Sequence, residues 1–246
     1  MNDLELARLI AEGAGKILLD ARASGLFAGK ALGRVGDHVA NAFIIAALRE
    51  NRPDDAILSE EEQDSEARLS AERVWIIDPL DGTREYGEDR ADWAVHVGLA
   101  VRGQPVLGAV ALPKLGQVML SQPQSLPPVP TRPRMVVSRT RPAPEAMMVA
   151  QVLGAELLPM GSAGAKAMAV LRGEAEIYLH TGGQYEWDNC APAAVALAAG
   201  FHASRANGTP LTYNHKNPYL PDLLICQKQF VPQVLAALAQ GKPTGT

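Results

Sequence analysis

The most informative segment of the sequence is Trp75-Ile76-Ile77-Asp78-Pro79-Leu80-Asp81-Gly82-Thr83. An apolar strand that ends at Asp78 delivers its carboxylate at the end of the strand, and Pro79 prevents the ladder from continuing. Two carboxylates three residues apart around such a turn can converge on one point. Because like charges at that point would repel, a divalent cation between them keeps both ionised. Oxygen ligands favour Mg²⁺ or Mn²⁺ over zinc.

The residues after this acid pair extend the same interpretation. Gly82 and Thr83 predict a turn into a helix, whose free N–H groups suit a phosphate beside the acids. The alternative for an isolated Asp-x-x-Asp is that Asp81 caps a helix and Asp78 ends a strand. Two further acids weaken that alternative, because Glu60 follows another apolar strand and Asp188 begins a predicted helix.

The first half of the chain predicts helices over 4–22 and 39–50, with a glycine-rich loop over 24–37 between them. Short apolar runs joined by tight turns then predict an antiparallel sheet, with strands at 56–58, 74–77, 93–101, 105–112 and 117–120.

The second half follows a proline-rich linker over 121–134 and alternates strands with helices. Strands are predicted at 135–137, 156–159, 175–179 and 222–226, and helices at 144–153, 163–172, 188–199 and 231–239. The predicted fold class is therefore layered α/β (α+β), with an antiparallel sheet in the first half and a mixed sheet in the second. Two domains are expected: a metal-binding domain over 1–125 and a domain over 132–246 that carries the substrate-specificity region.

Composition excludes several classes of protein. The chain has 23 Lys and Arg against 27 Asp and Glu, a formal net charge of -4, which argues against a nucleic-acid binder. The longest apolar stretch, Trp93 to Val101, is too short to cross a bilayer, and residues 1–5 lack the pattern of a secretion signal. We therefore expect a cytoplasmic protein with no membrane partner. Cys190 and Cys226 are expected to be buried, reduced thiols.

Three motifs together resemble the Mg²⁺-dependent, lithium-sensitive phosphatases related to inositol monophosphatase. They are Leu58-Ser59-Glu60-Glu61, the segment from Trp75 to Thr83, and Trp187-Asp188-Asn189-Cys190-Ala191-Pro192. The motifs occur in the family's order, and the resemblance covers essentially the whole chain. It implies the sugar-phosphatase fold, in which α and β layers alternate as αβαβα.

Other segments are similar to one branch of that family, the CysQ-type 3′(2′),5′-bisphosphate nucleotidases. They are Arg84-Glu85-Tyr86, where the inositol branch typically shows Thr-Asn-Phe, and the segment Gly161 to Lys166. The inositol branch usually carries a Glu seven residues before the Asp of its Trp-Asp motif, and Thr181 occupies that position here. The resemblance thus argues against inositol phosphate as the preferred substrate.

The resemblance also implies a role for each site residue. Asp78 would bridge two Mg²⁺ ions, Glu60 and the Leu80 carbonyl would complete the first, and Asp81 with Asp188 would complete the second. Glu60 would also hold a third, weaker ion through waters. Mn²⁺ is an alternative metal, and Li⁺ would inhibit by displacing the second ion.

Thr83 is the implied partner of the attacking water, with its hydroxyl polarised by Asp37, and the Gly82 and Thr83 amides would hold the phosphate. The family commonly shows Pro-Val-Thr-x-Ala-Asp before that aspartate, whereas this chain reads Leu32-Gly33-Arg34-Val35-Gly36-Asp37. The alternative for Asp37 is an N-cap of the helix that follows.

Substrate contacts are expected in the second half, at Gly161, Ser162, Lys166 and His180. Lys166 would neutralise the phosphate that is not cleaved, and its alternative is a solvated helix lysine. His180 has the alternative of a simply exposed histidine. Arg34 and Arg84 are further candidates for the second phosphate.

The function implied is a phosphohydrolase that converts adenosine 3′,5′-bisphosphate to AMP, with the sulfated analogue as a further substrate and a role in sulfate assimilation. An inositol-1-phosphate or fructose-1,6-bisphosphate phosphatase is the second candidate. A nucleotide-binding protein without turnover is the third, disfavoured because no acid of the metal set is missing. The expected partner is a phosphorylated nucleotide, and a homodimer is a candidate assembly.

Overall fold

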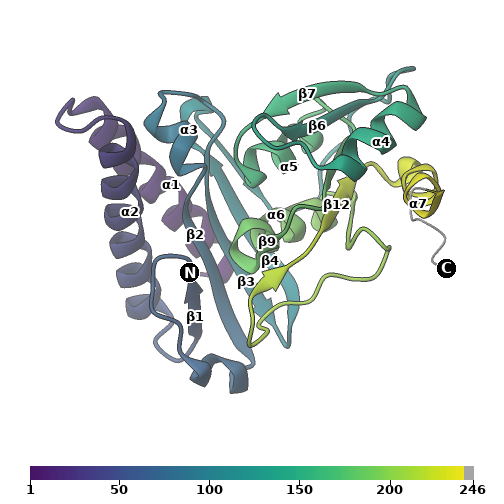
Figure 1. Ribbon diagram of the computed structural model, residues 1–246. Helices are drawn as coiled ribbons and strands as arrows, with labels where there is room; N and C mark the ends of the chain where they lie inside the picture. The colour runs from purple at the N-terminus through teal and green to yellow at the C-terminus, as the bar shows by residue number, and fades with distance from the viewer. Residues whose placement is uncertain (241–246) are drawn as a thin grey trace.

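Two five-stranded sheets form the frame of the computed structural model, which describes residues 1–240 (Figure 1). The first sheet has the order β1-β2-β3-β4-β5, built from β1 (Ala56–Ser59), β2 (Arg73–Asp81), β3 (Ala94–Val101), β4 (Gln104–Leu112) and β5 (Gln117–Leu120). The last four strands pair antiparallel, as predicted, but β1 pairs parallel to β2. The prediction of a purely antiparallel sheet is therefore wrong at this edge. Parallel neighbours need a long crossover, which residues 60–72 supply with the 3-10 helix η1 (Glu66–Ser70).

The second sheet is mixed, as predicted, and has the order β10-β12-β8-β6-β7. Its strands are β6 (Arg134–Ser138), β7 (Glu156–Met160), β8 (Ile177–His180), β10 (His202–Ser204) and β12 (Leu223–Cys226). A small two-stranded ribbon pairs β9 (Gln184–Tyr185) with β11 (Tyr219–Leu220). The sequence did not predict β9, β10 or β11, because strands of two or three residues are too short to show an alternating pattern.

The helices complete five layers, in the order αβαβα that the resemblance implied (Figure 1). The outer layer on the first sheet is α1 (Asp3–Ala23) with α2 (Gly29–Asn51), the central layer is α5 (Ala163–Leu171) with α6 (Glu186–Ala198), and the outer layer on the second sheet is α4 (Pro144–Leu153) with α7 (Val231–Gln240). Short helices α3 (Thr83–Gly87), η2 (Pro113–Leu115) and η3 (Lys228–Phe230) lie between strands and helices.

Strand β2 shows why the core forms in this way. Trp75 and Ile77 pack toward α1 and α2, whereas Val74 and Ile76 pack toward the central helices. Successive side chains of a strand point to opposite faces, so a strand covered on both sides must be apolar at every position. The continuous apolar run before Asp78 is the sequence signature of this central place.

Helix α2 begins earlier than predicted, so the expected loop over 24–37 is largely wrong. Its glycines allow close packing instead of loop flexibility. A Cβ atom on Gly33 would lie 2.7 Å from Cγ2 of Thr83, and one on Gly36 would lie 2.8 Å from Cε1 of Tyr86. Asp37 consequently lies inside α2, and the N-cap alternative for it is wrong.

Helix α6 packs with its backbone directly on the first sheet. A Cβ atom on Gly98 of β3 would lie 2.9 Å from the backbone nitrogen of Ala191, and one on Gly108 of β4 would lie 2.5 Å from its carbonyl oxygen. Only glycine tolerates this approach. The contact fixes the height of α6 above the sheet, and with it the position of Asp188 near the start of the helix.

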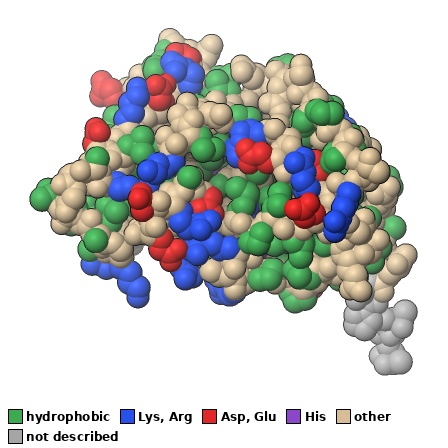
Figure 2. All heavy atoms as spheres, turned by 90° about the horizontal axis from the view of Figure 1, so that it is seen from above, with side chains coloured by type: hydrophobic (Ala, Val, Ile, Leu, Met, Phe, Trp, Pro, Cys, Tyr) green, Lys and Arg blue, Asp and Glu red, His purple; other side chains and the backbone are tan. Residues whose placement is uncertain are grey.

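One continuous apolar cluster joins the strands of both sheets through α5 and α6. The proline-rich residues 121–133 connect the sheets without regular structure, and the division into domains 1–125 and 132–246 stays a prediction. Seen from above, basic and acidic side chains are interspersed and form no single-sign patch on that face (Figure 2). Among residues 1–240, no helix combines the length and the hydropathy that crossing a bilayer requires.

Candidate active site

Three carboxylates meet in one cluster, two from the end of β2 and one from the first turn of α6. Asp78, Asp81 and Asp188 each offer an oxygen, and these oxygens lie within 4.8 Å of one another. Strand β2 continues through Pro79 to Asp81, but its register with β3 shifts between Asp78 and Asp81. In a regular strand, residues three apart face opposite sides, so this irregularity lets both carboxylates reach one point.

Asp81 is held by the N-terminus of α5. The Ser162 hydroxyl and the N–H groups of Ala163 and Gly164 all donate to its carboxylate. Burial alone would raise the pKa of Asp81, but the charge of His96 and these hydrogen bonds hold it at about 2. Asp81 therefore stays ionised, and its orientation is fixed by residues of the second half.

Asp78, Asp188 and Glu60 differ from Asp81, because folding raises their pKa values instead of lowering them. Burial, followed by the charge of Glu60, raises the pKa of Asp78 well above its usual value. Burial and the charge of Asp81 raise the pKa of Asp188 to about 6. The Glu60 side chain reaches solvent, but desolvation by the protein around it and the charge of Asp188 raise its pKa to about 8. Buried carboxylates crowded in this way fit a hard divalent cation, because such an ion accepts oxygen ligands and removes the repulsion.

Glu60 follows the end of β1 and lies outside the three-carboxylate cluster, but it is near enough for its charge to act on Asp78. Its backbone N–H donates to the Ile77 carbonyl at 3.2 Å, which places it beside the strand that carries Asp78. The side chain is exposed, in contrast to that of Asp78.

Thr83 and Asp37 lie together, as the resemblance implied. Thr83 Oγ1 is 3.2 Å from both Asp37 Oδ1 and the Leu80 carbonyl oxygen. Burial, followed by the charge of Glu61, raises the pKa of Asp37 to about 7. Between Asp81 and Thr83, Gly82 has a φ of 90°, a conformation that glycine adopts readily.

The predicted substrate segment lies at the site, but its polar groups are already bonded within the protein. The Gly161 N–H donates to Asp92, and the Ser162 hydroxyl is used by Asp81. Lys166 is 6% exposed, and its Nζ donates to the carbonyls of Gly161 and Ser162 at 2.6 Å each. The solvated-lysine alternative is therefore wrong, and in this geometry the ammonium holds the segment in place and does not face a second phosphate.

His180 is partly buried at the end of β8, so the alternative of a simply exposed histidine is wrong. Its Nε2 lies 3.0 Å from the Gly183 carbonyl oxygen. The contact joins the end of β8 to the turn that leads into β9.

The triplet Arg84-Glu85-Tyr86 anchors α3. Arg139 of the second half donates to Glu85 at 2.7 Å and to Glu88 at 2.6 Å. Tyr86 is buried, and its hydroxyl donates to the Leu18 carbonyl at 2.7 Å. These contacts tie the helix that begins at Thr83 to both α1 and the second half.

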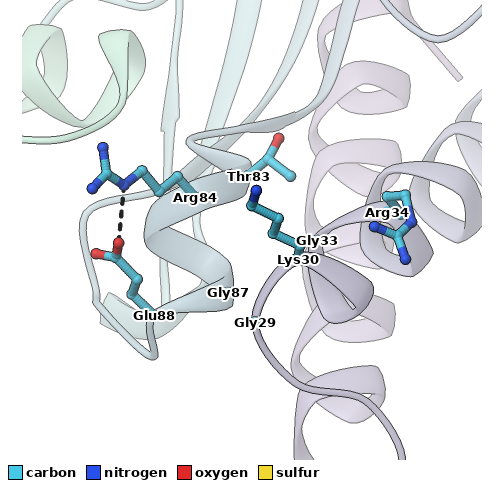
Figure 3. Close-up of a pocket in the computed structure, with 8 residues that line it drawn as sticks. All are labelled: Gly29, Lys30, Gly33, Arg34, Thr83, Arg84, Gly87 and Glu88. Carbon is cyan, nitrogen blue, oxygen red and sulfur yellow. Dashed lines mark hydrogen bonds and ion pairs between the residues drawn. The ribbon is translucent and has the colours of Figure 1, made fainter.

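A pocket of about 760 Å³ opens beside Thr83, between α2 and α3 (Figure 3). Lys30 extends from α2 toward Thr83, while Arg84 turns toward its ion-pair partner Glu88 (Figure 3). The pocket is lined by Gly29, Lys30, Gly33, Arg34, Thr83, Arg84, Gly87 and Glu88.

Sequence reasoning missed His96, a fully buried histidine of β3. Its Nδ1 lies 3.0 Å from the Trp187 carbonyl oxygen, which only accepts, so Nδ1 carries a proton. Its Nε2 lies 3.2 Å from Asp81 Oδ2. Burial would lower the pKa of His96, but the charge of Asp81, the hydrogen bonds to Asp81 and to the Trp187 carbonyl and the charge of Asp188 together raise it. The imidazole ring thus connects Asp81 with the backbone next to Asp188. An isolated His within an apolar strand gave no signal of this role.

We expect His96→Phe to lower the free energy of unfolding by about 3 kcal/mol, because it leaves the buried Asp81 carboxylate without its counter-charge. Urea denaturation without added metal measures this loss. His202→Phe is the control, since His202 is half-buried and its ring is hydrogen-bonded to the Ser204 hydroxyl, a neutral group. Equal unfolding midpoints for the two variants would contradict the importance of the His96–Asp81 pair.

Five alternating layers around a buried carboxylate cluster define the class of protein. The chain belongs to the inositol monophosphatase family, which it matches over residues 5–241. Its cluster is of the kind that a metal-dependent phosphatase requires.

Named relatives point to one branch of the family. A 3′-phosphoadenosine 5′-phosphate phosphatase from Mycobacterium tuberculosis (strain CDC 1551 / Oshkosh) is 49% identical over 238 residues, covering 92% of this chain and 89% of that protein. The 3′(2′),5′-bisphosphate nucleotidase CysQ of Escherichia coli (strain K12) is 32% identical over 198 residues, covering 75% and 80%. The crystal structure of CysQ from Bacteroides thetaiotaomicron shares the fold, with a TM-score of 0.79 and 24% identity over 92% of this chain and 97% of that one.

Proposed function

We propose that this chain is a Mg²⁺-dependent phosphatase that removes the 3′-phosphate from adenosine 3′,5′-bisphosphate and yields AMP. The observation that carries the proposal is the carboxylate cluster of Asp78, Asp81 and Asp188 beside the bonded pair of Thr83 and Asp37. The substrate is supported by the two nucleotidase relatives. The proposal includes the sulfated analogue as a further substrate, a role in sulfate assimilation and a cytoplasmic location.

In the proposed site, Asp78, Asp81 and Asp188 would hold two Mg²⁺ ions together with Glu60 and the Leu80 carbonyl. Bound there, Mg²⁺ or Mn²⁺ supplies Lewis acidity and neutralises phosphate charge, and a third ion on Glu60 is part of the proposal. Li⁺ is expected to inhibit by competing for this oxygen cluster.

Thr83 and Asp37 handle the proton of the attacking water. Because the Thr83 hydroxyl donates to Asp37, its lone pairs are free to accept a hydrogen bond from water and so orient it. Asp37, with a pKa near neutrality, is suited to take up the proton. The Gly82 and Thr83 amides hold the reacting phosphate.

The second phosphate is assigned to the pocket beside Thr83, which Lys30, Arg34 and Arg84 line. Lys166 and Ser162 would act on the substrate indirectly, by fixing the segment that starts at Gly161. His180 would support the neighbouring turn at Gly183.

Phosphate release from adenosine 3′,5′-bisphosphate, inositol-1-phosphate and fructose-1,6-bisphosphate, each with Mg²⁺ and with EDTA, tests the proposal. We expect the nucleotide to have a kcat/KM at least about tenfold above either sugar phosphate, a transition-state preference of about 1.4 kcal/mol, and EDTA to abolish release. A preference for a sugar phosphate would reject the substrate assignment but keep the phosphatase. Binding of the bisphosphate without release at any Mg²⁺ concentration would support a non-catalytic nucleotide-binding protein.

A further inference from the structure

Three aromatic side chains cluster on the ribbon formed by β9 and β11. Tyr185 and Tyr219 are direct cross-strand partners, and their rings meet at 80° with centroids 6.0 Å apart. Trp187 stacks on Tyr185, with centroids 4.8 Å apart and planes only 7° apart. The two tyrosines therefore form a right-angled corner, which we call the aromatic corner, and Trp187 supports it.

The aromatic corner is open to solvent. Tyr185 is 45% exposed and Tyr219 is 47% exposed, whereas Trp187 packs against the apolar core between the sheets. Tyr86, Tyr178 and Tyr213, the other tyrosines of the chain, are buried. Half-exposed tyrosine rings that are supported by a packed neighbour are typical of binding surfaces, because each ring offers an apolar face together with a polar hydroxyl.

The backbone holds the corner rigidly. The Gly183 N–H donates to the Pro221 carbonyl at 3.1 Å, and the Glu186 N–H donates to that of Pro218 at 2.8 Å. Gly183 has a φ of 84°, and a Cβ atom there would collide with the Tyr219 hydroxyl oxygen. The turn before β9 thus makes room for the ring of Tyr219.

The corner is also joined to the carboxylate cluster. The Tyr185 N–H donates to Asp188 Oδ2 at 2.6 Å, so the platform begins three residues before a carboxylate of the cluster. The backbone that carries the Tyr185 ring is therefore hydrogen-bonded to the carboxylate cluster itself. Sugar phosphates carry no planar ring for such a surface, whereas nucleotides do.

We propose that the aromatic corner binds the base of a nucleotide substrate by stacking. The inference rests on the proposed function and adds the group that distinguishes a nucleotide from a sugar phosphate. Stacking on aromatic side chains accepts any base, because every base has a π-face. The corner therefore selects nucleotides as a class and does not read the edge of adenine.

The test compares two ligands that differ only in the base, AMP and ribose 5-phosphate, by calorimetric titration in the presence of Mg²⁺. We expect the wild-type chain to bind AMP about tenfold or more tighter, since stacking of one base is worth about 1–3 kcal/mol. Tyr185→Ala should bring the two dissociation constants within about threefold of each other, and Tyr185→Phe, which keeps the ring, should restore the preference.

Tyr219→Ala provides an independent test from the other strand, and Val106→Ala, at a 50% exposed residue of β4, controls for loss of an exposed apolar group. Circular dichroism confirms that each variant is folded. An unchanged ratio of the two dissociation constants in both alanine variants, or a wild-type chain that binds both ligands equally, would overturn the inference. Failure of the proposed function is seen separately, as absence of phosphate release from the bisphosphate by the wild-type chain.

Discussion

Asp78→Asn is expected to lower kcat/KM for phosphate release by roughly a thousandfold or more. Asp78 is buried at the centre of the carboxylate cluster, and the proposed function gives it to both Mg²⁺ ions. Metal-ion stabilisation of a reacting phosphate is worth several kcal/mol, and each 1.36 kcal/mol corresponds to about a tenfold change in rate. The amide is isosteric with the carboxyl group but carries no charge. Steady-state phosphate release at saturating Mg²⁺ measures the loss.

Asp78→Asn is expected to lose activity without losing stability in the absence of metal. Because folding raises the pKa of Asp78, its charge costs folding free energy at neutral pH, above the unfolded pKa, and that cost vanishes as the pH falls. Asp78→Asn should therefore melt in EDTA no lower than the wild-type chain. Mg²⁺ should raise the melting temperature of the wild-type chain but not that of the variant. Asp54→Asn, an exposed carboxylate before β1, is the control. Near-normal turnover in Asp78→Asn would reject the metal assignment.

Asp81→Asn tests the metal assignment less cleanly than Asp78→Asn, although both residues belong to the same motif. The Asp81 carboxylate accepts from Ser162, Ala163 and Gly164, and it also faces His96. An amide nitrogen in place of one oxygen would set a donor against donors, which leaves buried groups unpaired. Loss of activity there would mix a metal effect with a folding effect.

Thr83→Val is expected to lower kcat by about a hundredfold to ten-thousandfold, which is the usual contribution of a positioned proton acceptor and its partner. Valine keeps the shape of threonine, so the methyl group that packs against Gly33 is retained and only the hydroxyl is lost. Asp37→Asn should show a loss of similar size, because the amide preserves the contact with Thr83 but has no charge to take up a proton.

Single-turnover and steady-state phosphate release separate an effect of these variants on the chemical step from an effect on substrate binding. KM should change by less than about threefold, because the substitutions act on the proton and not on substrate binding. Thr83→Ser keeps the hydroxyl and should retain most of the wild-type kcat. A double variant of Thr83→Val with Asp37→Asn should be little slower than either single variant, since the two residues act as one unit. Additive losses would show that the residues act independently.

Much of the fold could be predicted from periodicity alone. The predicted strands and helices of the second half lie nearly at their observed bounds, since α4 spans Pro144–Leu153 as predicted and β7 extends the predicted strand by one residue, although the short strands β9, β10 and β11 were missed. The errors have local physical causes. The glycines of residues 24–37 predicted a loop because sequence does not reveal which glycines are needed for close packing against Thr83 and Tyr86.

In the site, too, residues within a local motif could be predicted, whereas residues placed by tertiary contacts could not. The pair of Asp78 and Asp81 could be expected from its spacing in one motif. The contact of Thr83 with Asp37 was implied only by the family resemblance, because 46 residues separate the two and no local pattern marks Asp37. The place of Lys166 could not, since the carbonyls that bind its ammonium become available only when α5 forms. His96 and Tyr219 carry no local pattern, and their partners Trp187 and Tyr185 are far away in the sequence.

The hydrogen bonds from the N-terminus of α5 to Asp81 limit which segments of the enzyme can be replaced by those of a relative. A chimaera that replaced the second half without Ser162 and Gly164 would lose the donors that orient a carboxylate of the first half. The side chains of Tyr185 and Tyr219 are not among the donors to Asp81, so exchanging these side chains while keeping the Tyr185 N–H bond to Asp188 is the more conservative way to change ligand choice. Substitutions that change ligand choice can thus accumulate in related proteins while the carboxylate cluster stays the same.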